Sequence, residues 1–103
     1  MKYRLDYSKL MIDFWATQRN LHQASPMNQA VKLMEEVGEL ASGLNKNNPE
    51  VIKDSIGDIF VVLTIMCLQL GVELDECISS AYEQIKDRKG KLVNGVFVKE
   101  SDL

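Results

Sequence analysis

Apolar residues recur along this chain with the spacing of amphipathic helices, in segments separated by short polar connections. A first helix is expected from Tyr7 to about Leu21, with Asp6 as its candidate N-cap. A last helix is expected to begin near Leu74 or Asp75, because its apolar residues form one continuous stripe. That stripe consists of Leu74, Cys77, Ile78, Ala81, Tyr82 and Ile85.

Two helices between these are marked by the same kind of start signal. Ser-Pro at 25–26 and Asn-Pro at 48–49 each place a capping side chain before a proline at the first helical position. The earlier helix is expected to end near Leu44. The later one is expected to run to about residue 70, where Gly71 stops it.

The C-terminal part of the chain carries two further signals. The last helix is expected to end in the basic segment 86–90, with Gly90 as its C-terminal glycine. Asn94-Gly95, flanked by apolar residues, is typical of a hairpin turn. Four helices with short connections in 103 residues predict a single all-α domain, a four-helix bundle with a short C-terminal tail or hairpin.

Composition adds an expectation of self-association. The chain is 46% apolar and contains the unbroken apolar run 59–68, which is more apolar surface than so small a domain can bury alone. That run is about half the length of roughly twenty residues that a membrane span requires. We therefore expect a homo-oligomer, with no membrane partner.

Net charge and cysteine content limit the possible partners and the cellular compartment of the protein. The net charge of −3 provides no basic field for nucleic acid. Cys67 and Cys77 form no CxxC pair and are expected to be free thiols in a reducing compartment. Residues 1–4 lead into mixed polar sequence rather than a secretory signal, so a soluble, cytoplasmic protein is expected.

Acidic residues form the first candidate site, on the second predicted helix. With Glu35 at zero on a helical wheel, Glu39 falls near 40°, Lys32 near 60° and Glu36 near 100°. The apolar residues of this helix fall at roughly 140–240°. Three carboxylates and one lysine therefore border the face that is expected to pack on the core.

A second acidic group lies on the third predicted helix. Asp54 and Asp58 share a stripe with aliphatic residues, and the helix after Asp58 is apolar on almost every side. Both aspartates are therefore expected to be drawn toward the interior, where an unpaired carboxylate costs several kcal/mol. A hard cation with oxygen ligands would relieve that cost, and Mg²⁺ takes carboxylates, waters and substrate phosphates.

The alternative interpretation is that the glutamates form a solvated helix face and the aspartates favour the helix start. Asp58 argues against it, because it lies about two and a half turns beyond Pro49. That is too deep in the helix for an N-terminal charge effect.

The same residues carry a resemblance to a known family. Glu35-Glu36-x-x-Glu39, a linker, and an acidic pair ending at Asp58 before an apolar helix resemble the MazG-like all-α nucleoside triphosphate pyrophosphatase superfamily. The family pattern is EExxE followed by ExxD. This chain departs from it, because Ser55 stands where the family has glutamate and Asp54 is the nearest acid.

The resemblance implies hydrolysis of a nucleoside triphosphate between its α and β phosphates, with Mg²⁺ or Mn²⁺ as cofactor. It implies Glu36, Glu39 and Asp58 as metal ligands, with Asp54 in the displaced position. Glu35 would bind a second ion or position the attacking water. Glu35, Glu36, Glu39 and Asp58 are thus the candidate catalytic residues. Family members are dimers or tetramers with sites near subunit contacts.

Substrate-binding candidates are basic or aromatic, and each has a structural alternative. Lys32 could contact a phosphate or pair with Glu36 one turn away. Trp15 could stack on a base or belong to the core, and Arg19 lies one turn beyond it. A further basic group comprises Arg88, Lys89 and Lys91. These residues could bind phosphates or complement the dipole at a helix C-terminus.

Two functions remain open at this point. The first is a nucleotide pyrophosphohydrolase acting in housecleaning of the nucleotide pool. The second is a non-catalytic helical oligomerisation or regulatory module with a weakened metal site, which Ser55 favours. Release of pyrophosphate from a nucleotide distinguishes the two.

Overall fold

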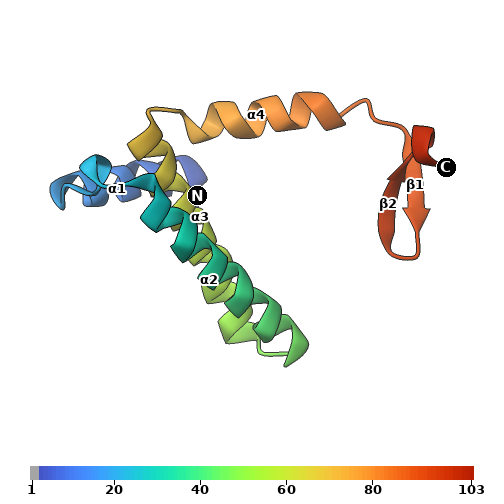
Figure 1. Cartoon of the computed structure of the whole chain (residues 1–103), viewed down its shortest axis with the longest axis horizontal. Coiled ribbons are helices and arrows are strands. Elements are labelled where there is room, and N and C mark those ends of the chain that lie inside the picture. Colours follow the sequence, from blue (N-terminus) through green and yellow to red (C-terminus); the bar gives the residue numbers. More distant parts are fainter. Residues whose placement is uncertain (1–2) are drawn as a thin grey trace.

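The structure is a computed structural model that describes residues 3–103 as helices followed by a small β-hairpin (Figure 1). Within this range it confirms the predicted all-α fold with a C-terminal hairpin. In chain order the elements are α1 (Leu5–Gln18), the 3₁₀ turn η1 (Leu21–Gln23), α2 (Pro26–Asn45), α3 (Pro49–Leu70), α4 (Leu74–Ile85), β1 (Gly90–Val93), β2 (Val96–Lys99) and the 3₁₀ turn η2 (Glu100–Asp102).

The start and stop signals of α2 and α3 act as the sequence predicts. The Ser25 hydroxyl accepts a hydrogen bond from the Met27 amide at 3.2 Å. The Asn48 side-chain oxygen accepts one from the Val51 amide at 3.3 Å. Gly71 ends α3 in a left-handed conformation, with φ +70°.

Two predicted helix boundaries are wrong. The N-cap position of α1 is Arg4, and Asp6 lies inside the first turn, where it pairs with Arg4 at 2.8 Å. The last helix ends at Ile85, before the basic segment, and no basic residue lies in its last turn. Gly90 begins β1 instead of capping the helix, because it pairs with Lys99 across the hairpin.

The hairpin turn forms at the predicted dipeptide. Asn94 and Gly95 both have positive φ, 51° and 80°, as a two-residue type I′ turn requires. The turn fixes an antiparallel register that pairs Gly90 with Lys99 and Val93 with Val96. Lys91 and Lys99 are thereby held on one small two-stranded unit.

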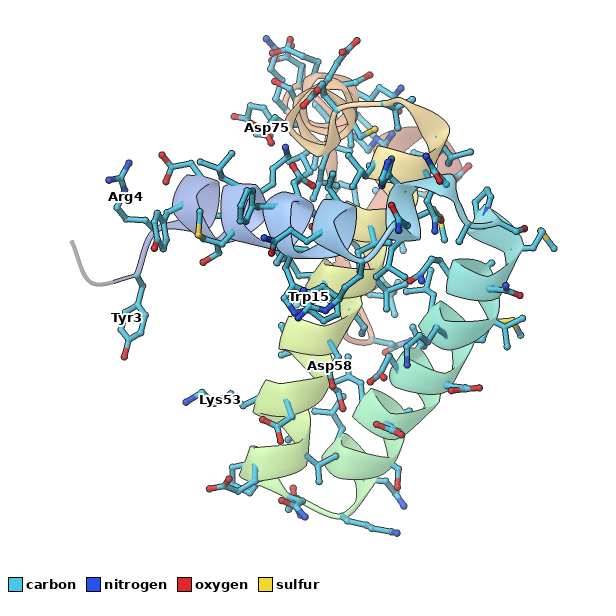
Figure 2. The ribbon with its side chains drawn as sticks, turned by 90° about the vertical axis from the view of Figure 1, so that its left-hand side faces the viewer. Tyr3, Arg4, Trp15, Lys53, Asp58 and Asp75 are labelled. Atoms are coloured by element: carbon cyan, nitrogen blue, oxygen red, sulfur yellow. The ribbon has the colours of Figure 1, made fainter. Side chains whose placement is uncertain are left out.

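Helices α2 and α3 form a closely packed antiparallel hairpin, and α1 crosses α3 near its C-terminal half (Figures 1 and 2). The closest approach is at Gly43, where an added Cβ would lie 2.9 Å from Val51 Cγ1. The buried apolar residues are few: Ala16, Val62, Ile65 and Leu74. Most of this small core therefore lies around α3.

Helix α4 stands apart from the other helices. It bends by 106° from α3 and extends away from the α2–α3 hairpin (Figure 1). The radius of gyration is 16.5 Å, whereas a compact chain of this length would have about 13 Å. Among the described residues no single helix is long and apolar enough to cross a membrane; α3 and α4 meet that test only as a bent pair.

The exposed surface is correspondingly large. The chain exposes 8122 Å², roughly 2,200 Å² more than the about 5,900 Å² expected for a compact protein of its mass. Side chains on the stripe of α4 are among the exposed apolar groups, with Ile78 54% accessible and Ile85 52%. The apolar part of α3 after Asp58 is buried or half-buried over residues 59–69, whereas Ile56 before it and Leu70 at its end are exposed.

Candidate functional site

The register of α2 against α3 brings the two acidic groups together. Gly43 meets Val51 close to the connection between these antiparallel helices. Each residue back along α2 is matched by one forward along α3, at about 1.5 Å per residue. Glu39 therefore lies level with Ser55, and Glu36 level with Asp58.

Glu36 is the acid most affected by its surroundings. Its side chain is half-buried, and Oε2 is inaccessible to solvent and has no hydrogen-bond partner. Burial raises the pKa of the Glu36 carboxyl above its ordinary value of 4.5. The charges of Glu39 and Asp58 raise that pKa further, while Lys32 opposes them. Glu36, Glu39 and Asp58 thus interact as one group.

The aspartates behave differently from the expectation. Asp54 and Asp58 are both exposed rather than drawn into the interior, and so is Glu35. Figure 2 shows Asp58 on the side of α3 that faces α2, with Lys53 pointing away from it. Among these acids, the carboxylate oxygen that is buried without a hydrogen-bond partner belongs to Glu36.

The predicted metal ligands Glu36, Glu39 and Asp58 act on one another without being assembled into a coordination shell. Within residues 3–103, no three His, Cys, Asp or Glu side chains are grouped closely enough to hold a metal ion. The donor chemistry nonetheless fits a hard divalent cation. An oxygen of Glu36 lacks a hydrogen-bond partner, and two further carboxylates act on that residue.

Trp15 and Arg19 form a stacked pair at the crossing of α1 and α3. The Arg19 guanidinium lies 4.3 Å from the centre of the Trp15 ring, and its Nη1 donates a hydrogen bond to the Trp15 carbonyl at 3.0 Å. Trp15 is 46% accessible, so it is not a core residue. Figure 2 shows it on α1 in front of α3, above Asp58 in that view. An exposed face of this pair could stack on a planar ring.

The predicted basic residues divide between two places. Lys32 is exposed on α2 and acts on Glu36, which is consistent with either of its proposed roles. The other three belong to the hairpin region, beyond the far end of α4 (Figure 1). They do not complement the dipole of α4, because they lie outside it; they are Arg88, Lys89 and Lys91.

The hairpin region holds a basic hollow that includes a residue not singled out from the sequence. An open hollow of about 510 Å³ is lined by Arg88, Lys89, Lys99, Glu100 and Ser101. A second of about 280 Å³ adjoins it and is lined in part by Lys89 and Lys91. Lys99 could have been found from the Asn94-Gly95 turn, since a two-residue hairpin pairs position 99 with position 90.

Comparisons with known proteins give a family match and a phage relative. The family model described as "MazG nucleotide pyrophosphohydrolase domain" matches residues 25–93, which include both acidic groups. A protein of Haemophilus phage HP1 (strain HP1c1), described as "Uncharacterized 18.2 kDa protein in rep-hol intergenic region", is 58% identical over 59 residues. That match covers 56% of this chain and 36% of the phage protein, so the chain spans only about a third of that relative. No solved structure matches.

Proposed function

The chain belongs to the MazG nucleotide pyrophosphohydrolase domain family, and from this premise we propose that it hydrolyses a nucleoside or deoxynucleoside triphosphate to the monophosphate and pyrophosphate. The observation that carries the proposal is the Glu36 oxygen, buried without a partner beside two further carboxylates. An arrangement of this kind destabilises the empty site and favours a divalent cation. We propose Mg²⁺, with Mn²⁺ as a substitute.

The acidic residues have separate roles in this proposal. Glu36, Glu39 and Asp58 hold the cation, and Asp54, one turn before Asp58, contributes from the exposed side. When bound, a divalent cation neutralises phosphate charge and lowers the pKa of a coordinated water. Glu35 is exposed at the edge of the group, where it orients the attacking water or holds a second ion. Ser55 is buried and lies level with Glu39, and it provides no carboxylate where the family pattern has a glutamate.

The remaining candidates bind the nucleotide. The Trp15–Arg19 pair offers an exposed aromatic and cationic face to the base. Lys32, on the acidic side of α2, contacts a phosphate of the bound nucleotide. Arg88, Lys89 and Lys91 supply further positive charge to the triphosphate. The chain acts as a homo-oligomer in the cytoplasm, on nucleotides rather than on nucleic acid, in housecleaning of the nucleotide pool.

A panel of nucleoside and deoxynucleoside triphosphates, assayed with Mg²⁺ and with Mn²⁺ for pyrophosphate release, tests the proposal. We expect turnover that EDTA abolishes, and a loss of roughly 100-fold or more in Glu39→Ala and in Asp58→Ala. Glu50→Ala removes an exposed acid from the first turn of α3, outside the acidic group, and is the matched control. Orthophosphate as the primary product would contradict the proposal.

A non-catalytic regulatory module is the second candidate function, and buried Ser55 favours it. Ser55 is 1% accessible and stands where the family pattern has a glutamate ligand. This candidate predicts no turnover with any nucleotide and a melting temperature that Mg²⁺ does not change. The proposed enzyme instead predicts that Mg²⁺ raises the melting temperature, because the cation binds the folded chain alone.

A further inference from the structure

The corner between α3 and α4 brings together the two cysteines of the chain. Cys67 lies three residues before the end of α3, and Cys77 is the fourth residue of α4. The Cys67 carbonyl accepts a hydrogen bond from the Val72 amide at 3.0 Å, and the Cys77 amide donates one to the Glu73 carbonyl at 3.1 Å. Both cysteine backbones are therefore tied to the same short connection, residues 71–73.

The side chains of the two cysteines also act on each other. Burial raises the pKa of the Cys67 thiol above its ordinary value of 9.0. Cys77 raises that pKa further, through its charge and through a hydrogen bond between the two side chains, while the ammonium of Lys9 opposes the shift. A disulfide requires such proximity, because cysteines whose Cα atoms are more than about 7 Å apart cannot be bridged without backbone movement.

The two thiols differ in their access to solvent. Cys67 is half-buried and lines a small hollow of about 30 Å³ together with Lys9 of α1. Cys77 is exposed and lines an open hollow of about 450 Å³ beside Glu76. It lies about 100° around α4 from Ile78, so it borders the apolar stripe rather than occupying its centre. A small oxidant therefore reaches Cys77 first, with a second thiol beside it, which is the usual arrangement of a redox-sensing cysteine pair.

The corner is also the place that determines the direction of α4. Beyond the buried Leu74, a groove of about 470 Å³ lies between α1, α3 and α4, lined largely by apolar side chains such as Phe60 and Tyr82. The ion pair between Lys9 and Glu73, at 3.5 Å, joins α1 to the corner, but the Glu73 side chain is 73% exposed and the pair is accordingly weak. Figure 1 shows α4 extending away from the other helices. A covalent bond across the corner would hold that direction fixed.

We propose that Cys67 and Cys77 form a reversible disulfide, with a hydroperoxide as oxidant, that fixes the direction of α4 relative to α3. The structure holds both thiols free and so represents the reduced form. This switch is independent of the nucleotide site, and it would stand if the chain proved catalytically inactive.

The oxidation proceeds in two steps with hydrogen peroxide. The Cys77 sulfur attacks one peroxide oxygen, the O–O bond breaks, and the departing hydroxide takes the thiol proton to leave as water, which gives a sulfenic acid. The Cys67 sulfur then attacks the Cys77 sulfur. The S–S bond forms, the S–O bond breaks, and a second water leaves with the Cys67 proton. The two thiols lose two electrons and the peroxide gains them; a dithiol reductant reverses the change.

Peptide mapping after treatment with hydrogen peroxide tests whether the bond forms. Glu73 and Glu76 lie between the two cysteines, so a protease that cleaves after glutamate separates them unless a disulfide joins the fragments. Free thiols are first alkylated, and only the band that runs as a single chain in a non-reducing gel is digested. We expect the linked pair of peptides, and its loss with dithiothreitol. Two alkylated thiols after peroxide treatment, or a disulfide found only between chains, would overturn the proposal.

The single variants test the assigned order of the two steps. In Cys67→Ser, the sulfenic acid on Cys77 has no thiol to displace it, so we expect dimedone to label this variant strongly and the wild type little. In Cys77→Ser, the half-buried Cys67 is expected to oxidise roughly tenfold more slowly than Cys77 does in Cys67→Ser. Equal dimedone labelling of Cys67→Ser and the wild type would contradict the assignment of Cys67 as the resolving thiol.

The effect on the corner is measured on the oxidised and reduced chains at the same protein concentration. We expect oxidation to raise the melting temperature by on the order of 10 °C. Hydrogen exchange at the Val72 and Cys77 amides, whose hydrogen bonds hold the corner, is expected to become slower. The double variant Cys67→Ser/Cys77→Ser, treated with peroxide, controls for methionine oxidation and should show neither change. Unaltered exchange at both amides in the disulfide form would overturn the switch, because α4 would be no more fixed than before.

Discussion

Glu36 is distinguished from its acidic neighbours by what surrounds its carboxylate. Glu35, Glu39 and Asp58 are exposed and can be solvated, whereas Oε2 of Glu36 has neither solvent nor a hydrogen-bond partner. Its ionised form is therefore disfavoured in the folded chain, first by burial and then by the charges of Glu39 and Asp58. In the absence of a cation, this one residue should make the fold less stable as pH rises.

Glu36→Gln tests this linkage in metal-free buffer. The folded-state pKa of Glu36 lies above its ordinary value of 4.5, so the wild type loses stability as pH rises from 4.5 through that raised value. The variant does not titrate there. We expect it to match the wild type below about pH 4 and to melt at a higher temperature near pH 7.

Thermal melts in EDTA across that pH range provide the measurement, with Glu35→Gln as the control. Glu35 is exposed, so its replacement should change the melting temperature little at any pH. Adding Mg²⁺ should raise the melting temperature of the wild type more than that of Glu36→Gln. A constant difference between Glu36→Gln and wild type at all pH values would contradict the account.

At the residue scale, sequence patterning identified the acidic group but misjudged which member is buried. The wheel placed Asp54 and Asp58 on an apolar stripe, which indicates burial only if something covers that stripe. Only the later part of the stripe is covered, since Val62 and Ile65 are buried whereas both aspartates, nearer the start of α3, are exposed. The sequence shows that Ser55 differs from the glutamate of the family pattern. Its 1% accessibility depends on the packing of α2 against α3, which hydrophobic periodicity does not predict.

Among the elements, the α2–α3 hairpin sets the geometry of the site, and Gly43 sets the distance between its helices. Val51 and Ile52 occupy the space that a side chain at Gly43 would need, with the Ile52 amide nitrogen 3.3 Å from the position of an added Cβ. This backbone atom cannot move aside as easily as the end of a flexible side chain can. The separation of the acids is therefore coupled to this glycine.

Gly43→Ala should separate the helices near their connection. Overpacking costs about 1–3 kcal/mol, and alanine returns about 1 kcal/mol of helix propensity. We expect the free energy of unfolding to fall by up to about 2 kcal/mol, read from urea denaturation at fixed protein concentration. In Gly38→Ala, the matched control, no atom lies within 4 Å of the added Cβ, so a gain of up to about 1 kcal/mol is expected. Equal effects in the two variants would contradict the close-approach argument.

Element boundaries were predictable where a local chemical signal exists. Ser25, Asn48 and Gly71 act through their own backbone or side chain, and α2 and α3 begin and end at these signals. The end of α4 was misplaced because the basic residues after Ile85 belong to a hairpin whose pairing, Gly90 with Lys99, is non-local. The angle between α3 and α4 likewise has no signature in either helix alone.

The whole molecule contains many more apolar residues than a single chain buries. Four apolar side chains, Ala16, Val62, Ile65 and Leu74, account for the fully buried apolar positions among the described residues. So small a core leaves a 103-residue chain with little hydrophobic stabilisation of its own. The exposed stripe of α4 and the groove beside it are therefore expected to be buried between copies, and folding to be coupled to association.

The double variant Ile78→Asp/Ile85→Asp tests that coupling. Both side chains are about half-accessible on the stripe of α4, and two charges placed there would have to be desolvated in any apolar interface. In size-exclusion chromatography with light scattering, we expect the wild type at a multiple of 11.7 kDa and the variant at 11.7 kDa, with a lower melting temperature. Ser80→Asp adds a charge about 200° around α4 from Ile78 and should leave the assembly intact. A wild type that is monomeric at micromolar concentration would refute the association, because the roughly 2,200 Å² of excess surface would then be stable in water.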